Sequence, residues 1–382
     1  MADKNITLRQ KNTSGVYDKL YTKTTATQSK LSTETAALFG DGTSDADTAL
    51  AKIADTVKSI GNVQVKVVDP NGNPIQGARI TGLYGTPTTA SDGTAHGVLQ
   101  INPISISSPY IDLKDQTADA SGYVGSFDVF TVTLPIVGEN AITRITSSKT
   151  VKFSKAVKTV DVCCVGGGGG GANYISYLSG ANDIRTYTNP GGGGGGIVNS
   201  IGVTVQSNTS YQILVGQGGT TKGAGSTNGS GNTGGTSSFA GVSAAGGGGG
   251  IAERIYVSGQ YTRKMEAGVA GVAGCGDGGS AQGNGGDANP GSANTTISEF
   301  NDGTTFYSGG GGAGSAGFNV VKAGGAPNGA SGAYRYNRVI NASSAGIGGG
   351  GGGGIIDSIG GSSYIGYASA GGPGLVAIRF HF

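Results

Sequence analysis

The 382-residue sequence is short of charge, tryptophan, cysteine and histidine. Its 25 basic and 23 acidic residues give a net charge of +2, which argues against a nucleic-acid binder that works by neutralising phosphates. Two histidines and three cysteines, with no CxxC pair, exclude a multi-histidine metal centre and a disulfide framework. We therefore expect no metal, no cofactor and no nucleic-acid partner.

Long hydrophobic segments are also missing. No apolar run approaches the ~18 residues of a membrane span, and the N-terminal residues Met1–Asn5 begin no hydrophobic signal core. We expect a protein that is made in a reducing cytosol without a signal peptide and that does not insert into a membrane.

Glycine is in excess, and its distribution is uneven. Of the 78 glycines, 13 lie in residues 1–165 and 65 in residues 166–382. The second group contains five runs, which are Gly166–Gly171, Gly191–Gly196, Gly246–Gly250, Gly309–Gly312 and Gly348–Gly354. Such runs are typical of flexible linkers. Strand-like segments separate these runs, however, and the strand Leu375–Phe382 follows them, which favours an ordered domain.

One ordered form of polyglycine is an extended threefold helix of the polyproline II type, which rises about 3.1 Å per residue. Several such helices packed side by side can pair their N–H and C=O groups with neighbours, so the backbone is satisfied. A Cβ atom directed into the bundle would hold the helices apart, so the packed positions must be glycine. A rigid lattice of packed polyglycine II helices is therefore one architecture open to these runs, beside the flexible linker.

The alternating segments between the runs predict a β-framework around this lattice. Val160, Val162 and Cys164 share one strand face, and Val376, Ile378 and Phe380 share another. Such faces must be buried against each other. We expect the first and last strands of this domain to be neighbours, with Cys164 acting as a small buried hydrophobe.

The rest of the chain predicts two smaller domains. Residues 1–61 are interpreted as an attachment module with a short helix at Ser44–Ile60. Its apolar positions step by four and three residues, at Ala46, Leu50, Ile53, Val57 and Ile60. This spacing fits either a short coiled-coil seam or an amphipathic helix packed on its own domain.

Residues 62–137 predict an Ig-like β-sandwich. Val63, Val65 and Val67 alternate with polar residues, and Asp69–Gly72 has the composition of a turn. Further short strands are expected at Leu99–Ile106, Tyr110–Leu113 and Val129–Leu134. With a glycine-rich domain at residues 138–382, the fold class is mainly β.

Three stretches resemble known families. The segment Val63–Ile80 is similar to bacterial Ig-like and carboxypeptidase-regulatory-like domains, which implies a spacer. The glycine-rich half resembles the glycine-rich domains of phage tail-fibre proteins, through Val160–Gly171, Tyr211–Gly219, Gly235–Phe239, Ala244–Gly250 and Gly372–Arg379 in that order. Tyr17–Thr25 resembles an N-terminal motif of tail and baseplate proteins of phages and phage-tail-like bacteriocins of Gram-positive bacteria, which usually have proline where this chain has Thr22.

These resemblances imply a receptor-binding protein at the tip of a virion tail fibre, made in the host cytoplasm. In T-even-type adhesins the glycine-rich region is a stack of polyglycine II helices, and loops at its distal end contact the host. The implied partners are a tail, baseplate or fibre protein at the N-terminus and a host surface glycan or protein at the tip. Fibres are often homotrimers, whereas some glycine-rich tips are monomers.

The segments between the runs carry the candidate binding residues. Tyrosine, phenylalanine and arginine set among serine, glycine and asparagine is the composition of an adaptable binding surface. The predicted receptor-binding residues are Tyr174, Tyr177, Arg185, Tyr187, Arg254, Tyr256, Tyr261, Arg263, Phe306, Tyr307, Tyr334, Tyr336, Tyr364 and Tyr367. If the receptor is anionic, such as a teichoic acid or an acidic polysaccharide, Arg185, Arg254 and Arg263 are the expected contacts. The alternative is that these aromatic residues pack on one another or on the lattice.

Three other functions compete with receptor binding. A glycan depolymerase would need paired carboxylates, and the few acidic residues of the glycine-rich half form no suggestive pair, so we expect no enzyme and no catalytic residues. An ice-binding protein would need a flat, regular face, which the long aromatic interruptions do not provide. A purely structural fibre protein, whose partner binds the host, stays open.

Overall fold

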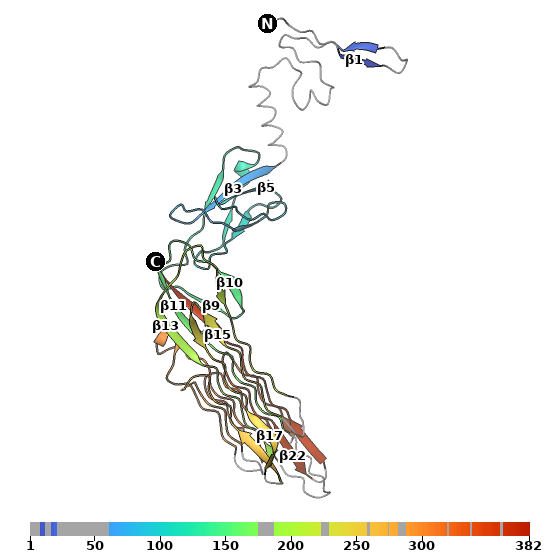
Figure 1. The fold of residues 1–382 in the computed structure, drawn as a ribbon, viewed down its shortest axis with the longest axis vertical. Coiled ribbons are helices and arrows are strands. Elements are labelled where there is room, and N and C mark those ends of the chain that lie inside the picture. The colour runs from blue at the N-terminus through green and yellow to red at the C-terminus, as the bar shows by residue number, and fades with distance from the viewer. Residues whose placement is uncertain are drawn as a thin grey trace. The chain divides into compact units, whose positions relative to one another are not determined.

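The computed structural model describes residues 8–11, 17–20, 61–174, 187–222, 229–257, 260–273, 275–281, 288–318, 321–336, 338–359 and 362–382 (Figure 1). The chain divides into two compact units, Met1–Ile136 and Val137–Phe382, which are described separately. The described residues are mainly β, with only two 3-10 turns, η1 (Ser121–Tyr123) and η2 (Glu299–Asn301). Among them, no helix has the length and hydrophobicity of a membrane span.

Little of the predicted attachment module is described. β1 (Leu8–Lys11) and β2 (Tyr17–Leu20) pair antiparallel as a hairpin, with Leu8 opposite Leu20. The predicted helix at Ser44–Ile60 lies outside the described residues.

The rest of the first unit consists of two three-stranded sheets around one apolar core. One sheet has the order β5 (Thr94–Val98), β3 (Asn62–Val68), β8 (Phe130–Thr133), and the other has the order β4 (Arg79–Thr81), β6 (Ile104–Ser107), β7 (Gln116–Ala118). The predicted alternation in β3 is confirmed, because Val63, Val65 and Val67 are all 0% exposed. The largest fully buried core side chains from the other elements are Ile75, Ile80, Leu83, Ile104, Ile106 and Leu134.

Of the elements expected from the sequence in this unit, one turn is present and two strands are shorter than expected. The turn at Asp69–Gly72 is confirmed, because the Asp69 carboxylate accepts the backbone N–H groups of Asn71 and Asn73. The predicted strand Leu99–Ile106 begins only at Ile104, because Pro103 has no N–H for a ladder. The predicted strand Tyr110–Leu113 is reduced to isolated bridges at Tyr110 and at Leu113, and the bridge of Leu113 is to Ile136.

The second unit has a β-framework at the end where β11, β13 and β15 are labelled in Figure 1. One layer has the order β13 (Ile197–Thr204), β11 (Thr159–Val165), β24 (Leu375–His381), β9 (Ile142–Ile145). β11 and β24 pair along their whole length, from Thr159 opposite His381 to Val165 opposite Leu375. The expectation that the first and last strands are neighbours is therefore confirmed.

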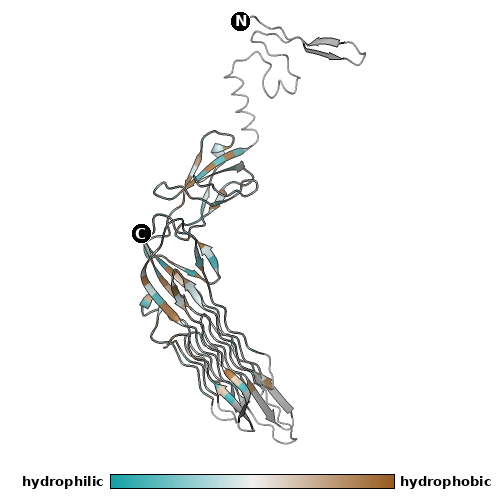
Figure 2. Ribbon diagram, viewed as in Figure 1, coloured by the Kyte–Doolittle hydropathy of each residue, from teal (hydrophilic) through white to brown (hydrophobic). Residues whose placement is uncertain are grey.

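Short strands form the second layer of the framework. β10 (Lys149–Val151) pairs with β14 (Tyr211–Ile213), and β15 (Ser237–Phe239) pairs with β16 (Val242–Ala244). Reciprocal backbone hydrogen bonds between Leu214 and Ser238 join the two pairs. Phe153 lies between the layers, with its ring centroid 6.0 Å from that of Phe239 and 6.4 Å from that of Phe380. Figure 2 shows hydrophobic residues along these framework strands.

β11 is buried on both of its faces. Cys163 and Cys164 point in opposite directions, and both are 0% exposed. Burial raises the pKa of each thiol to about 12, so neither is a reactive thiolate at neutral pH. The interpretation of Cys164 as a small buried hydrophobe is confirmed, and Cys163 has the same role on the other face.

The glycine runs extend from the framework as parallel and antiparallel extended segments (Figure 1). In residues 166–173, every third N–H bonds to the same neighbouring segment. Gly166, Gly169 and Ala172 donate to the carbonyls of Gly196, Gly193 and Pro190 in one neighbouring segment. The residues one position further along donate to a second segment, at Gly235, Asn232 and Gly229. Those two positions further along donate to a third segment, at Gly372 and Ser369. The backbone thus contacts neighbours in three directions as a donor.

The same segment also accepts hydrogen bonds from three further neighbours, through the N–H groups of Gly219, of Gly247 and Gly250, and of Gly351 and Gly354. Segments 189–196, 308–315 and 348–354 are likewise bonded to neighbours all around. The glycine runs in these four central segments are fully buried. We call the whole bonded array the glycine lattice.

Glycine is required in the central segments because neighbouring carbonyls fill the place of a side chain. A Cβ atom added to Gly168 would lie 1.9 Å from the carbonyl oxygen of Gly349, and one on Gly192 would lie 2.1 Å from that of Gly169. Real Cβ atoms do not approach backbone that closely. The stiffness of this part therefore comes from backbone hydrogen bonds between segments of the chain rather than from an apolar core.

Peripheral segments surround the central ones and use a different pattern. They include 215–220, 229–236, 245–252, 267–272, 276–280, 288–294, 322–326, 328–333, 341–346 and 367–374. Here a side chain at every third position faces solvent, as with Gln217 and Thr220, or Asn289 and Ser292. The run Gly246–Gly250 is peripheral, since Gly248 and Gly249 are only half-buried.

Candidate functional site

The connections between lattice segments gather at two opposite ends. Each segment reverses the direction of the one before it, so successive connections alternate between the framework end and the far end, which we call the tip. In Figure 1, β17 and β22 mark the tip of the second unit. The candidate site consists of the tip connections.

The described tip connections are short β-ladders. These are β12 (Tyr187–Thr188), β17 (Ile251–Val257), β18 (Gln260–Glu266), β19 (Ser315–Phe318), β20 (Tyr334–Tyr336), β21 (Arg338–Ile340), β22 (Ile355–Ile359) and β23 (Ser362–Gly366). β12 extends the β22–β23 hairpin, and β19 pairs with β20 of the β20–β21 hairpin. β19 also lies against β22, and β21 against β23. The ladders β12 and β19 to β23 therefore form one continuous group at the tip, and β17–β18 is a separate two-stranded hairpin.

The β17–β18 hairpin brings four of the predicted residues together. Arg254 pairs with Arg263, and Tyr256 pairs with Tyr261. Residues two apart on a strand share a face, as do directly paired residues. The two arginines and two tyrosines therefore occupy one face of this hairpin. Its other face carries Glu253 opposite Lys264.

The base of this hairpin is fixed to the lattice by the same face. Ala252 is 0% exposed and packs with Ala172, Tyr174 and Met265. Because Ala252 is two residues before Arg254, the arginine–tyrosine face continues outward from this cluster. Tyr174 thus supports the hairpin from below.

Asn189 holds Tyr174 in place below the hairpin, and its role was not predicted from the sequence. Its side chain is 0% exposed; the amide nitrogen donates to the carbonyls of Tyr174 and Gly354, and the amide oxygen accepts the N–H of Tyr174. Its position just before Pro190 and a glycine run was the available signal, because a side chain there must be accommodated at the end of a central segment.

The predicted site residues fall into four groups. Tyr187, Arg254, Tyr256, Tyr261, Arg263, Tyr334, Tyr336 and Tyr364 lie on tip strands, and Tyr367 follows β23 with 51% exposure. Tyr177 and Arg185 lie outside the described residues. Tyr174 is 1% exposed, so it has no surface to offer a receptor. Phe306 and Tyr307 lie at the framework end, away from the tip.

The segment containing Phe306 and Tyr307 covers the Cys163 face of β11. Glu299, which is 0% exposed, accepts hydrogen bonds from Arg144 of β9 and from the Tyr307 hydroxyl, with a distance of 2.9 Å from Arg144 Nε to Glu299 Oε1. Burial, reinforced by the Glu299 charge, raises the pKa of Tyr307. This corrects the expectation that Phe306 and Tyr307 belong to the receptor-binding surface: their segment lies at the framework end, where Phe300 and Tyr307 pack in the cluster with Cys163.

A second charged cluster joins β11 to the end of β24 in the framework. Asp161, 1% exposed, accepts the N–H of Gly202, both the Nε and an Nη of Arg379, and His381 Nε2 at 3.0 Å. His381 Nδ1 lies 3.0 Å from Glu139, which also accepts the N–H of Phe382. The Arg379 guanidinium carbon lies 4.7 Å from the centre of the Phe300 ring.

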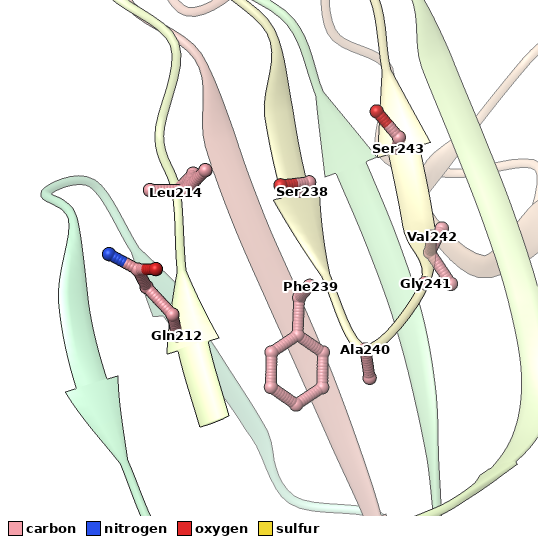
Figure 3. Close-up of a pocket in the computed structure, with 8 residues that line it drawn as sticks. All are labelled: Gln212, Leu214, Ser238, Phe239, Ala240, Gly241, Val242 and Ser243. Carbon is pink, nitrogen blue, oxygen red and sulfur yellow. The ribbon is translucent and has the colours of Figure 1, made fainter. Parts of the chain in front are cut away.

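Two further features of the described residues concern metal ligands and a pocket. No group of three or more histidine, cysteine, aspartate and glutamate side chains is arranged there to hold a metal ion. An open pocket of about 410 Å³ lies on the second layer of the framework, which consists of the short strands (Figure 3). Its lining residues are Gln212, Leu214, Ser238, Phe239, Ala240, Gly241, Val242 and Ser243. None of these is ionisable, so this pocket offers no acid or base.

The second unit matches a known protein family. Residues 143–381 match the family described as the glycine-rich domain. The match begins at β9 and ends at the last residue of β24, so it covers the framework, the lattice and the tip together. No curated protein matches this chain.

Proposed function

This chain belongs to the glycine-rich domain family, and from that premise we propose that it is an adhesin at the tip of a phage or phage-like tail. It is incorporated in the virion through its N-terminal module, which binds a tail, baseplate or fibre protein. The tip of its second unit binds a polysaccharide or protein on the surface of the host cell.

The glycine lattice is a stack of polyglycine II helices in this proposal. The support is the three-residue period with which one segment bonds to each neighbour, as in the series Gly166, Gly169 and Ala172. An extended helix with three residues per turn has this period. The first unit is an Ig-like spacer, supported by its two sheets around one core.

The arginine–tyrosine face of β17–β18 is the observation that carries the function. Directly opposed like charges destabilise a hairpin, so the Arg254–Arg263 pair is unfavourable for folding alone. An anionic ligand between the two guanidinium groups would relieve this repulsion, and arginine binds phosphate and carboxylate groups in a bidentate manner. Tyr256 and Tyr261 on the same face offer rings for stacking on sugars. We therefore propose an anionic surface glycan as the receptor.

We expect an Arg254→Gln/Arg263→Gln variant of the full chain to bind Gram-positive cell walls at least about a hundredfold more weakly. A hydrogen bond to a charged group contributes about 1.5–3 kcal/mol, which is about tenfold or more for each arginine. The measurement is a binding isotherm of labelled protein on purified walls, with and without acid extraction of the anionic polymers. Lys264→Gln, on the opposite face of the same hairpin, is the matched control and should bind normally.

Two results would contradict this proposal. Equal binding to extracted and unextracted walls would exclude the anionic polymer. Unchanged adsorption by the double arginine variant would move the binding site elsewhere and favour a structural fibre protein, whose partner contacts the host. Release of soluble glycan from the walls by the purified protein would instead indicate a depolymerase.

A further inference from the structure

Six peripheral segments of the glycine lattice meet water in the same way, with an exposed side chain at every third residue. We call these residues the lattice fringe. They are Gln217 and Thr220, Thr233 and Thr236, Asp277 and Ser280, Asn289 and Ser292, Ala323 and Ala326, and Tyr367, Ala370 and Pro373. No glycine of these six segments is exposed, although glycine is the commonest residue of the chain.

The inner positions of the same segments show why side chains occur only on the outside. A Cβ atom on Gly218 would lie 1.9 Å from the carbonyl oxygen of Gly371, and one on Gly291 would lie 2.0 Å from that of Gly310. An outward position has no neighbouring segment, so any residue fits there, glycine included. Packing within the lattice therefore does not explain why glycine is missing from the fringe.

Two glycines on the outside of other peripheral segments lie against a neighbouring side chain. The place of a Cβ atom on the half-buried Gly248 is 3.4 Å from Val269 Cγ2, and Val269 is 66% exposed. The place of a Cβ atom on the exposed Gly346 is 2.6 Å from Asn328 Oδ1. Where the outer residue has no side chain of its own, the next segment thus supplies one.

The edge of the lattice keeps backbone groups that are free to bind a further segment. The N–H groups of Gln217, Thr220, Thr233 and Asp277 bond to no acceptor among the described residues. Unpaired backbone groups along the edge of a β-sheet are a template for pairing with another chain. The edge of a glycine lattice presents the same hazard, because a second copy of this chain carries the same kind of edge.

We propose that the lattice fringe keeps the glycine lattices of separate copies from joining edge to edge. Inside the lattice the segments lie so close that a Cβ atom on Gly168 would be 1.9 Å from a neighbouring carbonyl oxygen. A second lattice approaching to the same spacing would meet the fringe Cβ atoms in the same way, so its backbone groups stay out of hydrogen-bonding range. A methyl group is sufficient for this, as at Ala323 and Ala326.

Replacing fringe residues by glycine or by alanine separates the effect of the Cβ atom from that of the polar group. We expect Gln217→Gly/Thr220→Gly, which leaves glycine at every position from 216 to 220, to self-associate at least about tenfold more strongly than Gln217→Ala/Thr220→Ala. Two new backbone hydrogen bonds between copies are enough for this factor. Both variants lose the hydrogen bond from Asn232 Nδ2 to Thr220 Oγ1, so its loss cancels in the comparison.

The measurement is sedimentation velocity of the full chain over a concentration series, with the unsubstituted chain as the baseline and a thermal melt of each variant. Ala323→Gly, which removes one methyl group, repeats the test at another segment if the double glycine variant is unfolded, and it should associate more strongly than the baseline. Equal association of the glycine and alanine variants would overturn the proposal. If both stay at the baseline, the fringe only reduces the entropy of the unfolded chain; if both rise, its polarity keeps the copies apart.

Discussion

Replacing Gly168 by alanine is expected to destabilise the second unit by about 3 kcal/mol or more, at or above the upper end of the cost of overpacking a core. The added Cβ would lie 1.9 Å from the carbonyl oxygen of Gly349 and 2.4 Å from its carbonyl carbon. These are backbone atoms of another central segment, and that carbonyl already accepts the N–H of Gly372. No side chain can move aside, so the lattice itself must separate.

Gly248→Ala is the matched control for this prediction, because it makes the same change in a peripheral segment. The nearest atom to its added Cβ would be the Val269 nitrogen at 3.3 Å. Replacing glycine where the backbone tolerates alanine stabilises by about 0.4–1 kcal/mol through the unfolded chain, so the net change should be small. Calorimetric melting of the full chain should show a decrease of about 6–12 °C for Gly168→Ala. Equal melting temperatures for the two variants would mean that the central segments are not tightly packed.

The second large effect is expected for Asp161→Asn, which removes the charge at the centre of the cluster with Arg379 and His381. Breaking a buried ion pair on one side costs about 3–5 kcal/mol. Arg379 keeps partial access to water, with 27% of its side chain exposed, so we expect a loss near the lower end. Glu139→Gln removes the half-exposed carboxylate partner of the same histidine, and it should cost far less stability than Asp161→Asn, because solvent screens a surface pair of this kind.

The same cluster gives the stability a pH dependence with two limbs. Burial opposes ionisation of Asp161, but hydrogen bonds from His381, the Gly202 N–H and Arg379 outweigh it and hold the pKa below its ordinary 3.8. The Phe382 N–H and His381, with Lys158 nearby, lower the pKa of Glu139 from 4.5. The hydrogen bond to Asp161 raises the pKa of His381 above 6.5, against partial burial and with help from Glu139.

The sign of each limb follows from these shifts. Lowered carboxyl pKa values contribute stability above the unfolded values near 4, and that stability is lost as the pH falls through the folded values. A raised histidine pKa contributes stability that is complete below 6.5 and is lost as the pH rises through the folded value. The contribution of the cluster should therefore be greatest between about pH 5 and 6.5. In denaturant titrations, His381→Gln should remove the alkaline limb and leave a smaller acid limb, which the Gly202 and Phe382 N–H groups and Arg379 still support; an unchanged alkaline limb would assign it to another group.

Part of the lattice was predictable from the sequence because its physical requirement is strict. Unbroken glycine is needed where a segment has neighbours on every side, which identifies the central runs around Gly168, Gly192, Gly311 and Gly351. The run Gly246–Gly250 was predicted with them although its segment is peripheral, whereas most peripheral segments need glycine at only two positions in three and form no unbroken run in the sequence. Gln217 and Thr220, three residues apart between glycines, show the pattern that marks them.

The candidate site was less predictable, because composition does not say at which end of the lattice a connection lies. The segments around Arg254 and Phe306 are both aromatic and both follow glycine-rich stretches, yet only the first is at the tip. Because each lattice segment reverses the direction of the one before it, the number of segments that precede a connection decides at which end it lies. That number cannot be counted from the sequence unless the peripheral segments are recognised. Tyr174 was misjudged for a related reason: it is the first residue beyond a central segment, where the lattice still buries its surroundings.

The four central segments also divide the sequence between two kinds of constraint. Backbone contacts alone set the positions of these segments. The segments therefore fix the distance between the framework and the tip, whichever residues the tip carries. A connection such as β17–β18 starts and ends at fixed lattice points, so its length and composition can change without altering the register of its neighbours. Insertion, deletion or exchange of one tip hairpin is therefore expected to leave the register of the glycine lattice unchanged.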